Sequence, residues 1–315
     1  MSTGTRSRST LVIGTRGSQL ALWQAEWVQG QLRAIAPEIC VIIKRIQTSG
    51  DKIQDVPLAK IGGKGLFVKE IEEALLRKEI DLAVHSMKDL PAVLPEGLQI
   101  ICVPEREDPR DALIGREAQK LEMLPLGGRV GTSSLRRQAQ LLHARPDLQM
   151  EVLRGNVDTR LRKLRDHHLD AIILAASGLK RLGWDQHVTE YLSVDVSLPA
   201  IGQGALGVEG REDDTFVRDL VAKFEHQPTR VTVAAERALL TRLEGGCQVP
   251  IAGYATLQGE TLMLDGLVAS LDGKRYVRHS LSGPTGEAES LGHSLAEELL
   301  DRGAQPILEE IYGTV

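Results

Sequence analysis

The stretch LVIGTRGSQLALWQAEWVQGQLRAI, residues 11–35, decides the fold class. It begins with a short apolar run at 11–13, which predicts a strand, and continues into a polar turn at 15–18. Apolar residues then recur at the spacing of an amphipathic helix: Leu20, Trp23, Trp27, Val28, Leu32 and Ile35. A strand, a turn and a helix in this order are the repeating unit of an α/β sheet.

The same alternation continues along most of the chain. Further strands are predicted at 41–43, 81–84, 98–103, 129–132 and 170–176, and helices at 66–77 and 135–142. From about residue 223 the pattern changes to a helix at 229–243, strands at 252–257 and 261–268, and helices at 291–302 and 307–312. The polar segment 105–111 and the Gly-rich segment 199–207 are predicted crossings between domains. We therefore expect an α/β protein of three domains: 1–104 plus 205–222, 105–204, and 223–315.

Composition excludes several classes of protein. The chain has 315 residues, of which 42% are hydrophobic and 26% charged, as in folded multidomain proteins. No apolar run approaches the roughly 20 residues of a membrane helix, and the first ten residues lack the apolar core of a secretory signal. The three cysteines lie far apart without a CxxC pair, which favours neither disulfides nor a zinc site. We expect a cytoplasmic protein that binds neither a metal nor a membrane.

Positive charge is concentrated in residues 129–165, which hold nine Arg or Lys against three Asp or Glu in a chain of net charge −5. The guanidinium fork suits carboxylates and phosphates. Arg136 and Arg137 follow a GTSS turn between a strand and a helix, where backbone N–H groups can bind an anion. Nucleic acid is the rival polyanion, but the net negative charge and the aromatic content of 3% count against it.

Two glycine motifs resemble nucleotide sites without meeting their requirements. GQGALG at 202–207 has the letters of a dinucleotide motif, but Pro199 interrupts the strand that should precede it. GGKG at 62–65 lacks the Ser or Thr that follows the lysine of a phosphate loop. Lys60 and Lys64 can still bind carboxylates from this loop.

Seven motifs in a fixed order make the chain similar to the porphobilinogen deaminase, or hydroxymethylbilane synthase, family. The resemblance spans about residues 11–312. The motifs are TRGSQLALWQ (15–24), LAKIGGKGLF (58–67), VHSMKDLP (84–91), GTSSLRR (131–137), RGNV (154–157), LPAIGQGA (198–205) and LEGGCQVP (243–250).

The resemblance implies a transferase of tetrapyrrole biosynthesis, including that of haem. The family joins four porphobilinogen molecules head to tail, releases ammonia, and frees the linear tetrapyrrole by hydrolysis. It uses a dipyrromethane cofactor bound through a thioether to a cysteine, which Cys247 matches here. The implied fold has two α/β lobes like those of type II periplasmic binding proteins and a third, smaller α/β domain that carries this cysteine. A monomer is expected.

Site residues are carried over from the matching motifs. Each pyrrole has an acetate and a propionate, so a growing chain of pyrroles is a polyanion that suits clustered cations. The implied catalytic residues are Asp89 and Arg16. The implied cofactor-binding residues are Cys247, Lys88, Ser134, Arg136, Arg137, Lys64 and Asp89. The implied substrate-binding residues are Arg16, Ser18, Lys60, Arg154, Arg160, Arg181 and Phe67.

The residues leave one alternative open, a non-catalytic two-lobed module that binds anions. Such a module accounts for the cations and the two crossings. It leaves Cys247 and the third domain unexplained, and it would need a secretion signal.

Overall fold

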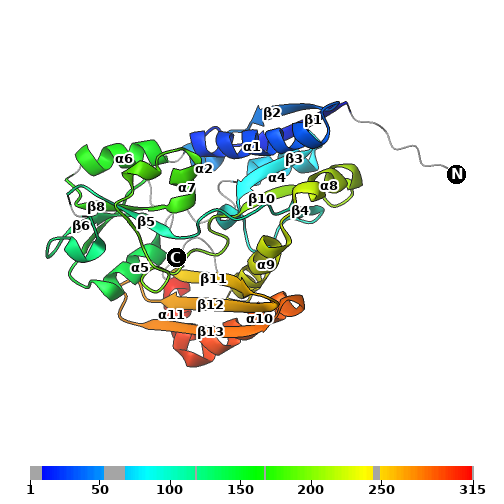
Figure 1. Cartoon of the computed structure of the whole chain (residues 1–315). Coiled ribbons are helices and arrows are strands. Elements are labelled where there is room, and N and C mark those ends of the chain that lie inside the picture. Colours follow the sequence, from blue (N-terminus) through cyan, green and yellow to red (C-terminus); the bar gives the residue numbers. More distant parts are fainter. Residues whose placement is uncertain (1–8, 53–67, 118, 167, 244–248, 314–315) are drawn as a thin grey trace.

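The computed structural model describes residues 9–52, 68–117, 119–166, 168–243 and 249–313 (Figure 1). Three sheets organise these residues, and each has its own hydrophobic core. No helix of the described residues is long and apolar enough to cross a membrane.

The first lobe is built on a five-stranded sheet of order β2-β1-β3-β10-β4. Strands β1, β2 and β3 are parallel, while β10 runs antiparallel to its neighbours β3 and β4. Leu11 and Ile13 of β1 and Leu32 of α1 are fully buried in one core. A separate core contains Leu75 of α4 and Ala83 of β3. The elements are β1 (Thr10–Thr15), α1 (Gln19–Ile35), β2 (Cys40–Arg45), α2 (Ser49–Lys52), α4 (Lys69–Leu76), β3 (Leu82–Ser86), the 3-10 turn η1 (Met87–Asp89), β4 (Leu98–Cys102), β10 (Leu206–Arg211), α8 (Thr215–Val221) and η4 (Ala222–Phe224).

The second lobe repeats this topology in the order β7-β6-β8-β5-β9. Here β6, β7 and β8 are parallel, and β5 is antiparallel to β8 and β9. The elements are β5 (Asp111–Gly115), η2 (Leu121–Met123), β6 (Arg129–Gly131), α5 (Leu135–Ala144), β7 (Gln149–Glu151), α6 (Val157–Asp166), β8 (Ala171–Ala175), α7 (Ala176–Arg181), η3 (Asp185–His187) and β9 (Glu190–Tyr191). In each lobe the antiparallel fourth strand follows a crossing from the other lobe, so the chain passes twice between them.

The two crossings lie against each other. The Glu107 N–H donates to the Gly204 carbonyl at 3.2 Å, and Arg106 Nε donates to the Gln203 carbonyl at 2.8 Å. Gly204 has a φ of +91°, and a Cβ there would lie 2.2 Å from the Glu107 oxygen. The second glycine of the GQGALG motif therefore serves the close approach of two backbones.

The third domain is an antiparallel sheet of order β11-β12-β13 with helices packed on its core. Its helix α9 is tied to both crossings through Glu236, which is fully buried. The Glu236 carboxylate accepts from Arg106 at 2.6 Å, from the Gly202 N–H at 2.7 Å and from the Ala255 N–H at 2.9 Å. The elements are α9 (Gln227–Arg242), β11 (Ile251–Gln258), β12 (Thr261–Ala269), β13 (Tyr276–Pro284), η5 (Thr285–Glu287), α10 (Ala288–Leu299), the kinked turn η6 (Leu300–Ala304) and α11 (Gln305–Gly313). The expected α/β class, with two mixed sheets and a smaller third domain, is confirmed.

Candidate functional site

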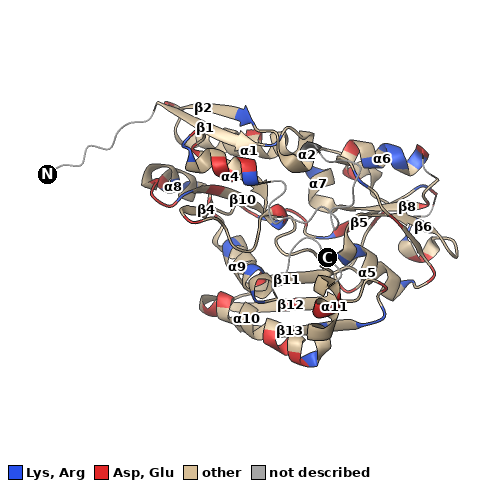
Figure 2. Ribbon diagram, turned by 180° about the vertical axis from the view of Figure 1, so that it is seen from behind, with Lys and Arg blue, Asp and Glu red and all other residues tan. Residues whose placement is uncertain are grey.

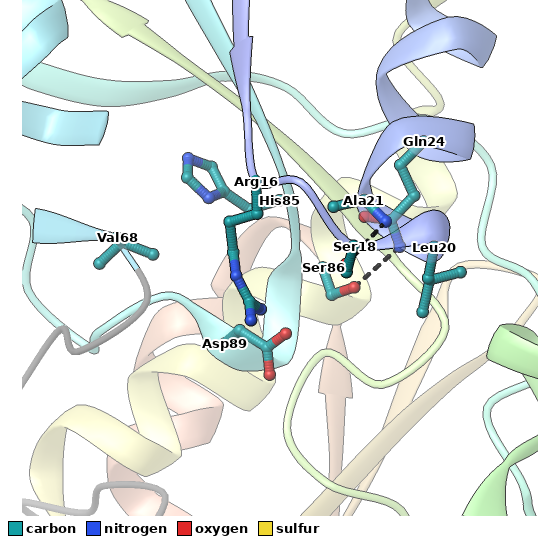
Figure 3. Close-up of a pocket in the computed structure, with 9 residues that line it drawn as sticks. All are labelled: Arg16, Ser18, Leu20, Ala21, Gln24, Val68, His85, Ser86 and Asp89. Atoms are coloured by element: carbon teal, nitrogen blue, oxygen red, sulfur yellow. Dashed lines mark hydrogen bonds between the residues drawn. The ribbon is translucent and has the colours of Figure 1, made fainter. Parts of the chain in front are cut away.

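A small pocket of about 60 Å³ opens where β1 and β3 of the first lobe end. The carboxyl ends of parallel strands are where α/β sheets bind ligands. Arg16 follows β1 and Asp89 follows β3, and Figure 3 shows the Arg16 guanidinium pointing toward the Asp89 carboxylate. Two residues from distant motifs, both expected to be catalytic, thus line one pocket.

The turn that carries Asp89 is fixed from both sides. The Met87 N–H donates to the Ala205 carbonyl at 3.0 Å, which ties η1 to the second crossing. Arg237 of α9 donates to the carbonyls of Pro91 at 2.8 Å and Ala92 at 3.0 Å. The backbone around Asp89 is therefore set by the crossing and by the third domain, while its side chain remains partly exposed.

The rim of the pocket is formed by the start of α1. Ser18 caps this helix, and its Oγ accepts from the Ala21 N–H at 3.3 Å. Gln24 donates from Nε2 to Ser86 Oγ at 2.9 Å (Figure 3). Sequence reasoning missed Gln24, Ser86 and His85 as lining residues, although Gln24 ends the TRGSQLALWQ motif and the other two lie within VHSMKDLP.

Lys88 and Arg137 meet on one side chain of the second crossing. Lys88 Nζ donates to Gln203 Oε1 at 3.2 Å, and Arg137 donates to the same oxygen at 3.4 Å. Burial, followed by the nearby charge of Arg137, lowers the pKa of Lys88 to about 8. Gln203 thus joins a lysine of the first lobe to an arginine of the second, and no local pattern in the sequence distinguishes it from the glycines around it.

Arg136 and Arg137 share a buried carboxylate partner. The two guanidiniums lie 2.8 Å from the carboxylate oxygens of Asp111, which is fully buried. Burial opposes ionisation of Asp111, but the two arginines hold its pKa far below the ordinary value. Arg136 also donates to the Leu198 carbonyl at 2.6 Å, and Ser134 Oγ caps α5 by accepting from the Arg137 N–H at 3.4 Å. Arg136 and Arg137 therefore pack against the second crossing, whereas Ser134 caps the helix that carries them.

Arg160 brings positive charge of the second lobe to Asp89. Burial, followed by the charges of Arg137 and Arg154, lowers the pKa of Arg160 to about 10, whereas Asp89 raises it. The Arg160 Nε donates to the Gly155 carbonyl at 2.7 Å. The charge of Asp89 in the first lobe therefore acts on Arg160 in the second.

Arg181 lies beside the crossing. It is 8% exposed, donates to the Gly204 carbonyl at 2.6 Å, and stacks its guanidinium 6.0 Å from the centre of the Trp23 ring. Burial lowers its pKa to about 10. Four other expected site residues, Lys60, Lys64, Phe67 and Cys247, lie outside the described residues.

Metal ligands do not gather in the part of the chain that the structure describes. No group of three or more His, Cys, Asp or Glu there could hold a metal ion.

The fold and the site together define a class of protein: two lobes joined by a double crossing, with cations of both lobes around one carboxylate, suited to a ligand with several carboxylates. Family comparisons make this more specific. Residues 11–219 match the model of the "Porphobilinogen deaminase, dipyromethane cofactor binding domain", and residues 230–301 match that of the "Porphobilinogen deaminase, C-terminal domain". The chain belongs to the porphobilinogen deaminase family.

Individual relatives agree with the family models. The porphobilinogen deaminase of Geobacter metallireducens is 62% identical over 302 residues, covering 96% of this chain and 95% of the relative. That of Pelobacter propionicus is 60% identical over 302 residues, covering 96% and 97%. The resemblance inferred from the seven motifs is confirmed.

Comparison with solved structures gives distant likenesses to binding proteins. The aliphatic sulphonate binding protein SsuA from Escherichia coli has a TM-score of 0.41 and 15% identity, over 76% of this chain and 71% of SsuA. A putative methionine-binding lipoprotein from Bacillus subtilis has a TM-score of 0.40 and 10% identity, over 68% and 90%.

Proposed function

We propose that the chain is a transferase that condenses four porphobilinogen molecules head to tail, releases ammonia, and frees linear hydroxymethylbilane by hydrolysis. Family membership supports this activity. The structural observation that supports it is the pocket that Asp89 and Arg16 line together at the strand ends of the first lobe, with Lys88 and Arg160 close enough for their charges to interact with that of Asp89. One carboxylate among cations from both lobes suits a substrate that carries carboxylates and develops positive charge on its ring.

The same cations fit a covalently held dipyrromethane. Burial and, after it, the charges of neighbouring arginines lower the pKa values of Lys88 and Arg160. An added polycarboxylate would relieve the part that comes from repulsion between these cations. We propose attachment at Cys247, with Lys88, Ser134, Arg136, Arg137, Lys64 and Asp89 around the group. When bound, the cofactor supplies the pyrrole terminus to which the first substrate unit is joined.

Asp89 is proposed as the proton-transferring residue. Loss of ammonia from porphobilinogen leaves a methylene-pyrrolenine, which is positively charged at the ring nitrogen. The Asp89 carboxylate stabilises that charge and accepts the proton released when the new pyrrole becomes aromatic. Arg16, whose guanidinium points to the same carboxylate (Figure 3), binds a substrate carboxylate beside the reacting carbon.

The remaining candidate residues hold the lengthening chain. Ser18, Lys60, Arg154, Arg160, Arg181 and Phe67 are proposed to bind successive substrate units. Arg181 donates to a carbonyl of the second crossing, and Gln203 of that crossing accepts from Lys88 of the first lobe. We propose that the spacing of the lobes responds to the bound chain by movement about the crossings. We propose the domains 1–104 plus 205–222, 105–204 and 223–315, with a monomeric, cytoplasmic enzyme. An unchanged scattering curve with each trapped intermediate would refute movement of the lobes.

Exchange of Asp89 for asparagine tests the function. Asp89→Asn is expected to fold and to retain the cofactor, as read from intact mass, while losing about 10²–10⁴-fold in turnover. The matched control is Asp213→Asn, an exposed aspartate of the same lobe, which should keep full activity. Turnover within about threefold of the parent would refute the role of Asp89. Porphobilinogen binding by the parent protein without any product would favour a binding module instead.

A further inference from the structure

A second cavity, of about 660 Å³, lies on the second lobe between α6, the end of β5 and the turn that contains η3. Its volume is in the range of small-molecule sites. The residues of the candidate active site given above do not line it. Figure 2 shows Lys and Arg along much of α6, the helix that forms one wall.

The cavity combines an aromatic wall with guanidiniums. Trp184 is partly buried in the core of the lobe together with Leu161 of α6, and both also line the cavity. Arg162 and Arg165 lie three residues apart on α6, so they share a face of the helix, and both are exposed. Arg116 adds a third guanidinium from the end of β5.

Carboxylates of the protein balance only part of this charge. Asp158 lines the cavity from the first turn of α6, and Asp170 lies 3.6 Å from Arg116. The three guanidiniums outnumber these two carboxylates. A ligand suited to the cavity has a flat apolar ring that packs on the indole and carboxylates that meet the guanidinium forks.

We propose that this cavity is a binding site for flat aromatic polycarboxylates, separate from the cleft between the lobes. Trp184 packs against the ring of the ligand, and Arg162 and Arg165 bind its carboxylates. The helix α6 also carries Arg160, on which the charge of Asp89 acts. The proposed cavity and the candidate active site therefore both have residues on α6. The proposed site does not rest on the transferase activity.

The test is a titration of the full chain, purified with any cofactor it carries, with benzene-1,3,5-tricarboxylate. Quenching of Trp184 fluorescence reports binding, and the Trp184→Phe variant separates it from the other two of the three tryptophans. Propane-1,2,3-tricarboxylate is the comparison ligand, because it carries the same number of carboxylates without a ring. Circular dichroism verifies that each variant is folded.

Two variants test the guanidiniums. Arg162→Gln/Arg165→Gln is expected to raise the Kd of the aromatic ligand about tenfold, as two charge-assisted contacts at an exposed site are lost. The control, Arg275→Gln/Arg302→Gln, removes two exposed arginines of the third domain and should leave the Kd within about twofold.

Each result bears on the proposal. The proposal is supported if only the aromatic ligand binds tightly, if the quenching signal is lost in Trp184→Phe, and if binding is weaker in Arg162→Gln/Arg165→Gln. Equal binding of both tricarboxylates, quenching that survives in Trp184→Phe, or equal weakening in the control overturns it. Competition with porphobilinogen that the α6 variants leave unchanged would place the ligand in the cleft and also overturn the proposal.

Discussion

Replacement of Asp111 by asparagine should destabilise the whole junction between the lobes. Asp111 is fully buried, and its carboxylate faces the guanidiniums of Arg136 and Arg137, each 5% exposed. Ser197 Oγ and Gln203 Nε2 donate to the same carboxylate at 2.7 and 2.9 Å. The substitution removes the only negative charge among these five residues and leaves two buried cations.

The expected loss is large compared with the stability of a typical domain. Removing one partner of a buried ion pair costs about 3–5 kcal/mol. Two guanidiniums lose their partner here, and an amide offers only one acceptor oxygen. We therefore expect the free energy of unfolding to fall by about 5 kcal/mol, compared with a typical total of about 5–15 kcal/mol for a domain.

The pH dependence of this loss has a definite sign. The folded-state pKa of Asp111 is far below its ordinary value of 3.8, so its contribution is present above pH 3.8 and is lost only as pH falls toward the folded-state value. The difference between parent and variant should therefore be the same at pH 6 and pH 8.5.

Urea unfolding followed by circular dichroism and fluorescence measures this difference. The control is Asp147→Asn, which breaks a more exposed pair with Arg145 and should cost much less. A loss below about 1 kcal/mol for Asp111→Asn, or a loss equal to that of the control, would refute the assignment of Asp111 as the charge partner that holds the junction together. Recovery of stability in Asp111→Asn/Arg136→Gln relative to Asp111→Asn would support it.

Three further substitutions probe the site and its supports. Lys88→Gln should raise the KM for porphobilinogen, measured by steady-state kinetics, strongly at pH 7 and much less at pH 9.5. The reason is that the pKa of Lys88 is about 8, so the parent lysine is itself largely uncharged at the higher pH. An equal effect at both pH values would contradict a role for the charge of Lys88. Glu72→Gln should raise the midpoint of thermal unfolding at pH 8.5 and leave it unchanged at pH 3.5. Burial followed by the charge of Glu209 raises the pKa of Glu72 from 4.5 to about 7, so the folded state loses stability as pH rises from 4.5 to about 7. A gain confined to pH 3.5 would reverse the sign and refute the explanation. Gly204→Ala should destabilise the crossings by about 1–3 kcal/mol, because the φ of +91° at Gly204 and the nearby Glu107 oxygen both exclude a Cβ. An unchanged midpoint of urea unfolding would contradict the close packing of the two crossings.

The sequence predicted the alternation of strands and helices well because apolar periodicity is a local signal. Residues 11–13 and 20–35 form β1 and α1 as expected, and 261–268 falls within β12. The sequence does not predict β13, because its residues are only partly buried or exposed and only Val277 and Leu281 of one face pack on the core of the third domain. The short strand β9 has two residues and no pattern of its own.

The sequence also located the cations but not their partners. Asp111 ends a polar segment that resembled a solvated crossing, and nothing local indicates that it is buried between Arg136 and Arg137. Gln203 and Glu236 contact residues more than 90 positions away, such as Arg106. Contacts of this range depend on the double crossing, which is a property of the topology.

The most direct test of the account is the intact mass of the denatured, purified protein beside that of Cys247→Ser. Cys40→Ser, which removes an exposed thiol elsewhere, is the matched control. We predict that the parent and Cys40→Ser exceed their sequence masses by two linked pyrrole units, whereas Cys247→Ser has its bare sequence mass. A parent protein that keeps its bare mass after incubation with porphobilinogen, or a Cys247→Ser variant that still carries the increment, would contradict it.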